Sequence, residues 1–214
     1  MSRPLVVTTF LTLDGVMQAP GGPQEDLSGG FAHGGWHQPP TADDDTGPQL
    51  ISEWFAGAQD FLLGRTTYEL FASFWPQVPA DAGNPIADAL NTKTKWVASR
   101  TLDTVDWDNA RLIEGDVVEA VQKLKAEDGG ELQVHGSAGL IQTLLAHDLV
   151  DELRLTIDPV TVGGGKRLFG DGTIPRGWRL TSSQATSAGA LIATYQRVGD
   201  LRTGEFTLED EING

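Results

Sequence analysis

Apolar side chains recur along the chain in two rhythms, which predict two kinds of secondary structure. Four segments place apolar residues three or four positions apart, the spacing that gives an amphipathic helix one buried face. We expect helices around residues 50–55, 70–75, 117–124 and 140–145. Because each apolar stripe covers only one face, these helices are expected to lie against a flat surface such as a sheet.

Short apolar and β-branched runs, typical of buried strands, cover residues 5–11, 61–63, 95–98, 111–113 and 132–134. Strands that alternate with helices imply right-handed crossovers and a largely parallel sheet. After Leu149 the pattern changes to alternation over 152–157, 179–184 and 190–197, with a hairpin turn predicted at Ser187-Ala188-Gly189. The sequence therefore predicts a single α/β domain with a central mixed, mostly parallel sheet and a C-terminal antiparallel hairpin.

Two segments follow neither rhythm. Residues 19–49 hold seven glycines and five prolines without a sustained period, so we expect a long structureless loop that acts as a lid or is disordered. Residues 199–214 end in a cluster of carboxylates and are expected to form an acidic, loosely packed tail. The predicted domain accordingly spans residues 1–198.

Composition limits the classes of function. The 214 residues include no cysteine, which excludes disulfides, thiolate nucleophiles and cysteine-ligated metals, and no metal site is predicted. The chain shows neither a membrane-spanning apolar run nor a secretory signal, so we expect a cytoplasmic protein. A net charge of −15 disfavours nucleic acid and anionic membranes as partners. In so acidic a protein, a phosphorylated cofactor has to be held by the few arginines and by helix N-termini.

Four turns between predicted elements carry candidate chemistry. Gly64-Arg65-Thr66-Thr67 follows a strand and opens a helix, and Thr66 and Glu69 have the spacing of a capping box that would fix the helix start. A helix N-terminus beside an arginine is an anion site, although a capped helix with its arginine in solvent explains the same residues. Ser99-Arg100-Thr101 ends the next strand and suits the ribose 2′-phosphate of NADPH; a solvated turn is the alternative.

The third turn is His135-Gly136-Ser137-Ala138-Gly139, where a strand again runs into a helix. Its glycines allow a pyrophosphate to approach the backbone, and Ser137 can cap the helix or bond a phosphate oxygen. The spacing is not G-x-G-x-x-G, which disfavours a Rossmann dinucleotide fold. Gly163-Gly164-Gly165, in the fourth turn, indicates either close approach of a ligand or a flexible hairpin. Because ligands of open α/β sheets gather at the carboxyl ends of strands, the turns are expected to act together.

Taken in order, these turns resemble the dihydrofolate reductase-like superfamily, and most closely the reductase domain of riboflavin biosynthesis. Thr12-Leu13-Asp14-Gly15 resembles the first-strand signature of that branch, and the turn at 64–69 resembles its cofactor-phosphate turn. The turns at 98–101, 135–139 and 159–169 resemble its adenosine-phosphate turn, its pyrophosphate turn and its late glycine loop. The resemblance covers roughly residues 4–198 and implies a three-layer αβα fold, NADPH as the cofactor and a homodimer.

The resemblance also implies hydride transfer to a small pterin-like or pyrimidine-like heterocycle, or to a carbonyl substrate. Two departures concern the substrate half. The riboflavin enzymes usually carry a glutamate where His135 stands in this chain. The zinc signature of their deaminase half cannot exist here, because the chain has no cysteine.

Three residues are candidates for the catalytic acid or for orienting the substrate. Asp14 would face the nicotinamide end of the cleft, or would simply form a turn with Gly15. His33 lies in the predicted lid, where a histidine can donate a proton near neutral pH. His33 and His37 are four residues apart, the spacing of a metal-binding pair on a helix, but the glycines at positions 34 and 35 disfavour a helix there. Glu53 is the acidic residue nearest to the position of the acid in folate reductases.

Two other functions compete with a reductase. The turn at Ser137 mimics the strand–serine–helix elbow of a serine hydrolase, yet no histidine follows His147 to complete the triad in that order. The chain is alternatively a nucleotide-binding module that kept the cofactor cleft without catalysing a reaction. The principal prediction is an NADPH-dependent reductase that acts on a small molecule.

Overall fold

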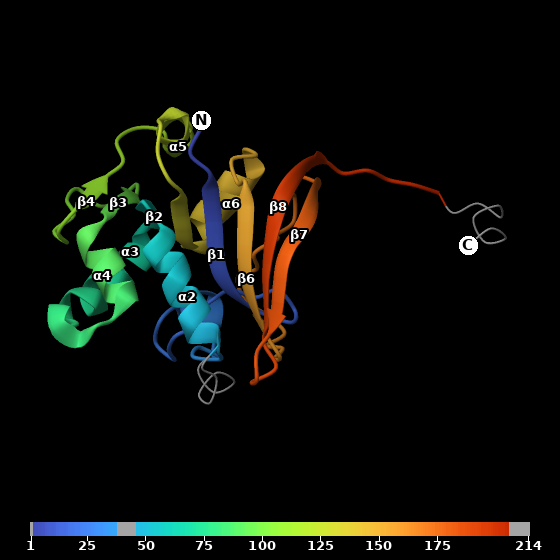
Figure 1. Ribbon diagram of the computed structural model, residues 1–214, viewed down its shortest axis with the longest axis horizontal. Coiled ribbons are helices and arrows are strands. Elements are labelled where there is room, and N and C mark those ends of the chain that lie inside the picture. The colour runs from blue at the N-terminus through green and yellow to red at the C-terminus, as the bar shows by residue number, and fades with distance from the viewer. Residues whose placement is uncertain (1, 38–45, 206–214) are drawn as a thin grey trace.

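A single sheet of eight strands runs through the computed structural model, which describes residues 2–37 and 46–205 (Figure 1). The strand order across the sheet is β4-β3-β2-β5-β1-β6-β8-β7. The strands are β1 Leu5–Thr12, β2 Asp60–Gly64, β3 Thr94–Ala98, β4 Ala110–Leu112, β5 Leu132–Gly136, β6 Glu152–Asp158, β7 Arg176–Ala185 and β8 Leu191–Asp200.

The first six strands are all parallel, and only β8 runs against its neighbours β6 and β7. This arrangement confirms the mostly parallel sheet and the antiparallel hairpin predicted from the sequence. Parallel strands buried on both faces need continuous apolar runs, and Phe61, Leu62 and Leu63 of β2 are all fully buried.

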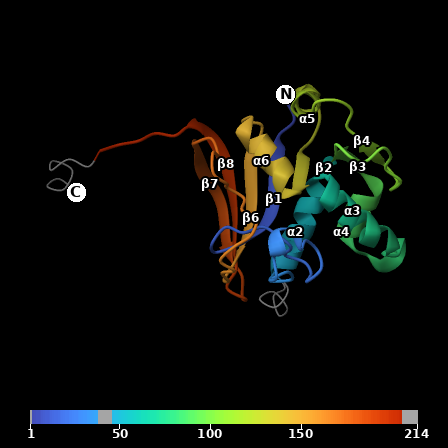
Figure 2. The same ribbon diagram turned by 180° about the vertical axis from the view of Figure 1, so that it is seen from behind.

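Helices cover both faces of the sheet, as expected for a three-layer fold. The helices are α2 Thr46–Gly57, α3 Arg65–Phe74, α4 Pro85–Thr92, α5 Val117–Ala126 and α6 Ala138–Ala146, with short 3₁₀ turns η1 Ser28–Gly30, η2 Trp75–Gln77 and η3 Ala80–Ala82. Phe61 and Leu63 pack in one core with α2, α3 and α4, whereas Leu62 packs in the other with α5 and α6. Viewed from opposite sides, α2 lies in front of the sheet in Figure 1 and α6 in front of it in Figure 2.

Helix α4 was not predicted from the apolar pattern. It is only eight residues long, and its first position is a proline, which favours a helix start because it lacks an N–H. The Asn84 side chain caps it by accepting hydrogen bonds from the backbone N–H groups of Ile86 and Ala87. None of the described helices is long and apolar enough to cross a membrane.

The described part of the predicted lid is packed rather than structureless, contrary to the expectation from its composition. Its two arms pair through hydrogen bonds from Gly35 N–H to the Ala19 carbonyl and from the Trp36 indole to the Gln18 carbonyl, the latter 2.7 Å long. Phe31 and Trp36 are buried in a small core of their own. A loop of this kind, closed at its ends and filled by its own side chains, is an Ω-loop. The remaining lid residues 38–45 lie outside the described part of the chain.

The predicted tail begins later than expected. Strand β8 continues to Asp200, which pairs with Arg176 of β7, so residues 199 and 200 belong to the sheet. Most of the acidic cluster falls within residues 206–214, outside the described residues.

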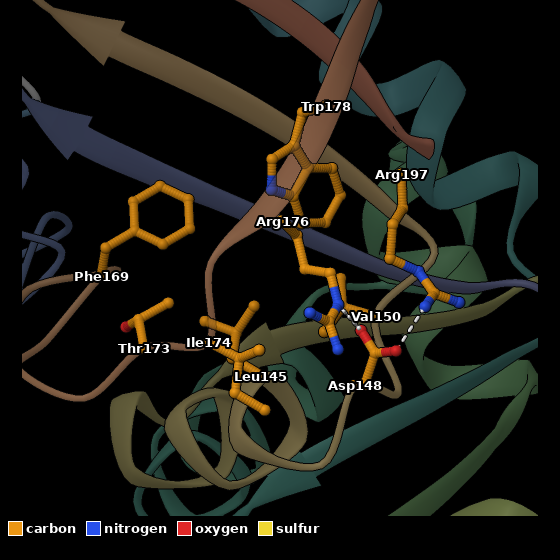
Figure 3. Close-up of a pocket in the computed structure, with 9 residues that line it drawn as sticks. All are labelled: Leu145, Asp148, Val150, Phe169, Thr173, Ile174, Arg176, Trp178 and Arg197. Carbon is orange, nitrogen blue, oxygen red and sulfur yellow. Dashed lines mark hydrogen bonds and ion pairs between the residues drawn. The ribbon is translucent and has the colours of Figure 1, made fainter. Parts of the chain in front are cut away.

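A chain of ion pairs links the elements at the amino ends of the parallel strands, and Figure 3 shows its part around Asp148. Asp148 binds Arg176 on one carboxylate oxygen at 2.9 Å and Arg197 on the other at 2.7 Å. Arg197 also reaches Asp151, which in turn binds Lys125 of α5. The adjoining cavity has a volume of about 20 Å³, enough for about one water molecule, so this edge of the sheet is filled by its own side chains.

Candidate functional site

The carboxyl ends of the parallel strands meet at the opposite edge of the sheet, and the predicted turns follow them there. The turns that contain Arg100, Arg65 and Ser137 follow β3, β2 and β5, which are neighbours in that order. The next strands along the edge are β1 and β6. Four strand spacings of about 4.8 Å separate β3 from β6, so this row extends over roughly 19 Å.

The turns after β2 and β5 touch each other, and only glycine fits at the contact. A Cβ atom on Gly64 would lie 2.2 Å from the Ser137 hydroxyl oxygen and 2.8 Å from the Ser137 backbone nitrogen. A Cβ atom on Gly136 would lie 2.5 Å from the Thr67 hydroxyl, and φ is +147° at this residue. The Gly136–Ser137 peptide bond is cis. The close approach brings the starts of α3 and α6 side by side.

Both of these helices begin without a capping side chain. Gly64 and Ser137 occupy the N-cap positions of α3 and α6, and neither forms a side-chain cap. By contrast, α4 is capped by Asn84 and α5 by Asp116. Backbone N–H groups in the first turns of α3 and α6 therefore lack the usual side-chain acceptor, and the positive ends of two helix dipoles converge. This arrangement suits a bound anion.

The predicted capping box in the β2–α3 turn is wrong. Helix α3 begins at Arg65, with Gly64 at its N-cap. Thr66 therefore lies inside the first turn and does not cap the helix. Glu69 does not reach back to a cap; its carboxylate binds the Arg65 guanidinium at 3.1 Å, one helical turn away. That pair is half-exposed and therefore easily rearranged by a competing anion.

The turn after β3 presents a cation that has no partner. The Ser99 hydroxyl accepts hydrogen bonds from the backbone N–H groups of Thr101 and Leu102, at 3.1 and 3.0 Å, which fixes a tight turn. Arg100 is exposed and forms neither an ion pair nor a hydrogen bond within the described part of the chain. The geometry leaves its guanidinium available to an anion at this edge.

The His135 side chain points away from the turn that it precedes. Its ring stacks on Phe55 of α2 at 4.2 Å, and Nε2 lies 3.1 Å from the Gln133 side-chain oxygen. Burial lowers the pKa of His135 to about 3, with a smaller contribution from the positive charge of Arg154. The imidazole is therefore neutral, and only the backbone of His135 is placed to contribute to the predicted phosphate turn.

Protein contacts account for much of the glycine loop after β6. The backbone N–H groups of Val162 and Gly163 donate to the Asp14 carboxylate at 3.2 and 2.9 Å. Hydrogen bonds from the Thr12 hydroxyl and from these amides lower the pKa of Asp14. A Cβ atom on Gly165 would lie 2.8 Å from Val16, whereas one on Gly164 would meet nothing. Asp14 thus fastens the glycine loop to the turn that follows β1, the role of a turn residue rather than of a free acid.

The other two predicted catalytic residues are exposed. His33 lines an open groove of about 390 Å³ between the lid and the glycine loop, with its ring edge-on to Phe31 at 5.8 Å. Glu53 lies on α2 and accepts a hydrogen bond from Gln49 at 3.2 Å. Since Ile51 and Phe55 form the buried face of α2, Glu53 points away from the sheet. This placement argues against Glu53 as the catalytic acid.

A buried acid–base pair at the carboxyl end of β6 escaped the sequence-based prediction. Asp158 is completely buried, and its Oδ2 lies 2.8 Å from Nδ1 of His37. The other carboxylate oxygen, Oδ1, has no hydrogen-bond partner among the described residues. The His37 ring lies against Phe10 of β1, with 4.0 Å between the ring centroids and the rings tilted by 37°. The two residues are 121 positions apart, and the only sequence signals are a histidine in an aromatic lid and an acid at a strand end.

The described residues do not assemble the alternative hydrolase site or a metal site. His135 turns its ring towards Gln133, and His147 stands at the far end of α6, about 15 Å along the helix from Ser137. Neither histidine is hydrogen bonded to the Ser137 hydroxyl. No group of three or more potential metal ligands occurs in residues 2–37 and 46–205.

Comparison with known sequences points to one family. The family model described as the RibD C-terminal domain matches residues 3–192. The uncharacterized protein YyaP of Bacillus subtilis is 33% identical over 135 residues, which cover 63% of this chain and 71% of YyaP. The uncharacterized protein YwjB of the same organism is 26% identical over 123 residues, covering 58% of this chain and 65% of YwjB.

Solved structures show the same fold. A putative riboflavin biosynthesis protein from Shewanella sp. PV-4 aligns with a TM-score of 0.65 and 26% identity over 92% of this chain and 99% of its own. Dihydrofolate reductase from Enterococcus faecalis, solved with NADP(H), aligns with a TM-score of 0.55 and 17% identity over 92% and 99% of the two chains. A Thermotoga maritima deaminase/5-amino-6-(5-phosphoribosylamino)uracil reductase aligns with a TM-score of 0.60 and 15% identity, over 92% of this chain and 57% of that protein.

Proposed function

The chain belongs to the RibD C-terminal domain family, and from that membership we propose that it is an NADPH-dependent reductase of a small heterocyclic or carbonyl substrate. The fold is reductase-like, and its neighbours include proteins named as reductases. The proposal goes beyond the fold in three respects: the cofactor, the class of substrate and catalysis itself.

The observation that carries the proposal is the contact between the two uncapped helix starts. Gly64 and Gly136 bring the starts of α3 and α6 into contact, and neither helix has a side-chain cap, so the N–H groups of both first turns lie close together. The α-helices α4 and α5, by contrast, are capped by Asn84 and Asp116. A pyrophosphate would supply the missing acceptors.

The residues present fit NADPH from one end of the row to the other. We expect the adenosine 2′-phosphate at Ser99-Arg100-Thr101, and the pyrophosphate at Gly64-Arg65-Thr66-Thr67 and at residues 136–139. Open space beside Gly139 leaves room for a ligand against the backbone. Of the glycine loop, Gly164 remains a candidate for a cofactor contact, since the Gly163 N–H is bound by Asp14 and Gly165 is packed against Val16 and Phe31. The cofactor supplies the hydride, and the protein supplies orientation and a proton.

We expect the substrate near two aromatic pairs that follow the phosphate turns along the sheet. Phe10 lies against His37 with the rings tilted by 37°, and Phe55 stacks with His135. Flat rings recognise a flat substrate, which favours a pterin-like or pyrimidine-like heterocycle over an aliphatic carbonyl compound. The related Thermotoga protein is named for a uracil-type reductase activity, which lies in the same chemical class.

We also propose that the protein forms a homodimer. Strand β7 is ten residues long, and its outer edge pairs with no strand of the described residues. An exposed edge of this length, with the half-exposed apolar side chain Leu180, is a surface that proteins normally cover. Light scattering on the purified protein should give twice the chain mass. A strictly monomeric protein at working concentrations would disprove the dimer and leave the reductase proposal untouched.

Cofactor binding and turnover distinguish the reductase from its alternatives. Purified protein is titrated with NADPH while nicotinamide fluorescence is followed, and then supplied with a dihydropterin, a ribosylaminopyrimidine and an aromatic aldehyde. NADPH binding with oxidation by any of the three supports a reductase. Binding without oxidation supports a nucleotide-binding module. Covalent labelling of Ser137 by a fluorophosphonate would favour a hydrolase, although the positions of His135 and His147 argue against it.

A further inference from the structure

We propose that the open groove between the lid and the glycine loop binds a small organic acid, an anion with an apolar body. The groove has a volume of about 390 Å³ and is lined by Gln18, by lid residues 28–33 and by loop residues 162 and 164–166. Sites for small molecules commonly have this size. The inference goes beyond the proposed reductase and does not require NADPH binding, so its test contains no cofactor.

A buried amide joins the two walls of the groove. Nε2 of Gln18 donates to the carbonyls of Asp26 and Ser28 in the lid, at 3.0 and 2.9 Å. Its Oε1 accepts a hydrogen bond from the backbone N–H of Lys166 in the glycine loop, at 3.0 Å. The Met17 N–H also donates to the Lys166 carbonyl, at 2.8 Å. Because both walls are fixed to each other by these bonds, the groove is formed before a ligand binds.

Glycines keep both walls free of side chains. Gly29 and Gly30 lie on the lid side and Gly164 on the loop side, and a Cβ atom on any of the three would meet no other atom within 4 Å. Phe31, which is buried, and Val162, which is half-buried, pack together and make part of the lining apolar. The apolar body of a ligand can therefore contact these two side chains and the glycine backbone without displacing a residue.

The ionisable side chains that line the groove are basic. Lys166 and His33 belong to the lining, whereas none of the lining residues, all of them in the described part of the chain, carries a carboxylate. The chain has 30 acidic and 15 basic residues, so a groove without an acid departs from the rest of the surface. Nζ of Lys166 and the ring N–H of His33 are hydrogen-bond donors. Such a lining is complementary to an anion.

An internal carboxylate already binds Lys166, and it shows how an external one would do so. Nζ of Lys166 lies 2.6 Å from Oδ2 of Asp26, and the lysine side chain is 45% exposed. Oδ1 of Asp26 accepts hydrogen bonds from the backbone N–H and the hydroxyl of Ser28, at 3.0 and 2.6 Å. An ammonium has three N–H donors, and an exposed ion pair is rearranged at little cost. A ligand carboxylate therefore shares Lys166 with Asp26 or replaces it.

Other kinds of occupant use only part of this lining. An inorganic anion would bind the ammonium but leave the apolar wall exposed to water, and a neutral ring would gain nothing from Lys166. A cation would be repelled by Lys166. An organic acid uses both the charge and the apolar surface, which is why the proposal commits to this class of ligand.

The test uses benzoate, a simple aromatic acid, added to the isotope-labelled full-length protein. Backbone amide chemical shifts in NMR spectra report both the affinity and the place of binding, with Ala32 and Gly164 as reporters for the two walls. Benzamide has nearly the same shape without the charge, and inorganic phosphate has the charge without the ring. Comparing the three probes separates the two parts of the proposal.

Three substitutions test the site, and two are matched controls. Lys166→Met removes the ammonium and keeps most of the stem, and Lys123→Met makes the same change at an exposed position on α5. Asp26→Asn removes the internal competitor. Gly164→Leu fills the groove, and Gly204→Leu makes the same change at an exposed position outside it. If Lys166→Met fails to fold, the double variant D26N/K166M, which is neutral at both positions, replaces it.

We expect benzoate to bind with a Kd on the order of 1 mM and to shift the amides of both walls. Benzamide and phosphate should each bind about tenfold more weakly, as should benzoate to Lys166→Met. Asp26→Asn should bind benzoate about threefold more tightly, because Lys166 is no longer shared. A purely structural ion pair would not give that gain. Gly164→Leu should abolish binding, and the two control variants should match wild type.

Several results would overturn the inference. One is the absence of any shift at tens of millimolar benzoate, or shifts confined to residues outside the groove. Equal affinity for benzamide would disprove the anionic part, and equal affinity for phosphate would disprove the apolar part. Unchanged benzoate binding by folded Lys166→Met or Gly164→Leu would place the ligand elsewhere. None of these results bears on NADPH, whose binding is measured separately, so their failure leaves the reductase proposal intact.

Discussion

The two edges of the sheet treat their polar groups in opposite ways. At the amino ends of the parallel strands, Asp148 and Asp151 bind Arg176, Arg197 and Lys125 in a continuous network. Figure 3 shows the part of it around Asp148. At the carboxyl ends, two helices start without side-chain caps, and within residues 2–37 and 46–205 neither Arg100 nor one oxygen of Asp158 has a partner. Buried and clustered polar groups are normally satisfied within a protein, so the carboxyl edge is the exception.

We interpret this difference as a division between a stabilising edge and the proposed binding edge of one sheet. The chain has a net charge of −15 and only 15 basic residues. Three of these, at the amino edge, pair with two aspartates in a network that stabilises the fold. The carboxyl edge keeps an unpaired cation despite the acidic surroundings. Groups left unsatisfied by the protein are those that a ligand would satisfy, which is the expected behaviour of a binding edge in an α/β fold.

The largest expected effect comes from separating the two helix starts at the carboxyl edge. In Gly64→Ala the new methyl group would collide with the Ser137 backbone. We expect a loss of about 3 kcal/mol in the free energy of unfolding, or roughly 6–12 °C in Tm, together with loss of NADPH binding.

Gly139→Ala is the matched control for stability, since nothing lies near the position of its Cβ. It should unfold like wild type in calorimetry yet bind NADPH more weakly, because the open space beside it is where the ligand is expected. An equal Tm for Gly64→Ala and wild type would contradict the close contact.

The second effect concerns acid sensitivity at the carboxyl edge. His135 has a pKa of about 3 in the folded protein and about 6.5 when unfolded, so the unfolded state binds more protons between these values. Its contribution to stability is complete above pH 6.5 and is lost as the pH falls, by roughly 1.4 kcal/mol per pH unit. His135→Phe keeps the ring against Phe55 and should flatten the pH dependence of unfolding between pH 6.5 and 5 by about 2 kcal/mol. Denaturant titrations at several pH values measure this difference, and parallel curves for the two proteins would show that the ring titrates normally.

The third effect is confined to the amino edge. Asp148→Asn removes the charge shared by Arg176 and Arg197 while keeping the side-chain shape. The side chain is about one-third exposed, so we expect a moderate loss of about 1–2 kcal/mol in stability. NADPH affinity should not change, since the phosphate turns lie at the other edge. Weaker NADPH binding by a folded Asp148→Asn protein would undermine the division of roles between the edges.

The smallest expected effect is the most specific one. Arg100→Ala removes an exposed side chain without a partner, so its effect on the free energy of unfolding should stay within about 0.5 kcal/mol. If Arg100 binds the 2′-phosphate, the preference for NADPH over NADH should fall about tenfold, which equals about 1.4 kcal/mol. Parallel fluorescence titrations with the two cofactors measure this ratio. An unchanged ratio would remove Arg100 from the site.

Most of the fold was predictable because its elements follow simple periodicities. The apolar spacing along the chain was enough to predict α2, α3, α5 and α6, and continuous apolar runs were enough to predict the parallel strands. Helix α4 did not, since it depends on the Asn84 cap and a proline start more than on an apolar face. The Thr66–Glu69 capping box was wrong because the chain offers a competing partner: Arg65 is one turn from Glu69 and binds it. Spacing alone does not rank such alternatives.

The site divides in the same way. The proposed cofactor turns are local in sequence, so their position at the carboxyl ends of the strands was predictable, although the side-chain direction of His135 was not. The substrate end depends on contacts between distant segments. Asp158 and His37 are 121 residues apart, and the lid that carries His37 has no periodicity to predict its packing. The sequence left Asp14 open between an acid at the nicotinamide end and a turn residue, because the loop that it binds, at Gly163, lies 149 residues away.

Thermal unfolding of the wild-type protein with and without NADPH tests the central claim most directly. A ligand at about one hundred times its Kd stabilises the folded state by about 2.7 kcal/mol, which for a chain of this size raises Tm by roughly 5–10 °C. We predict a shift of this size with NADPH and a clearly smaller one with NADH at the same concentration. An unchanged Tm with both cofactors, at concentrations up to several millimolar, would contradict the assignment of the carboxyl edge as a dinucleotide site.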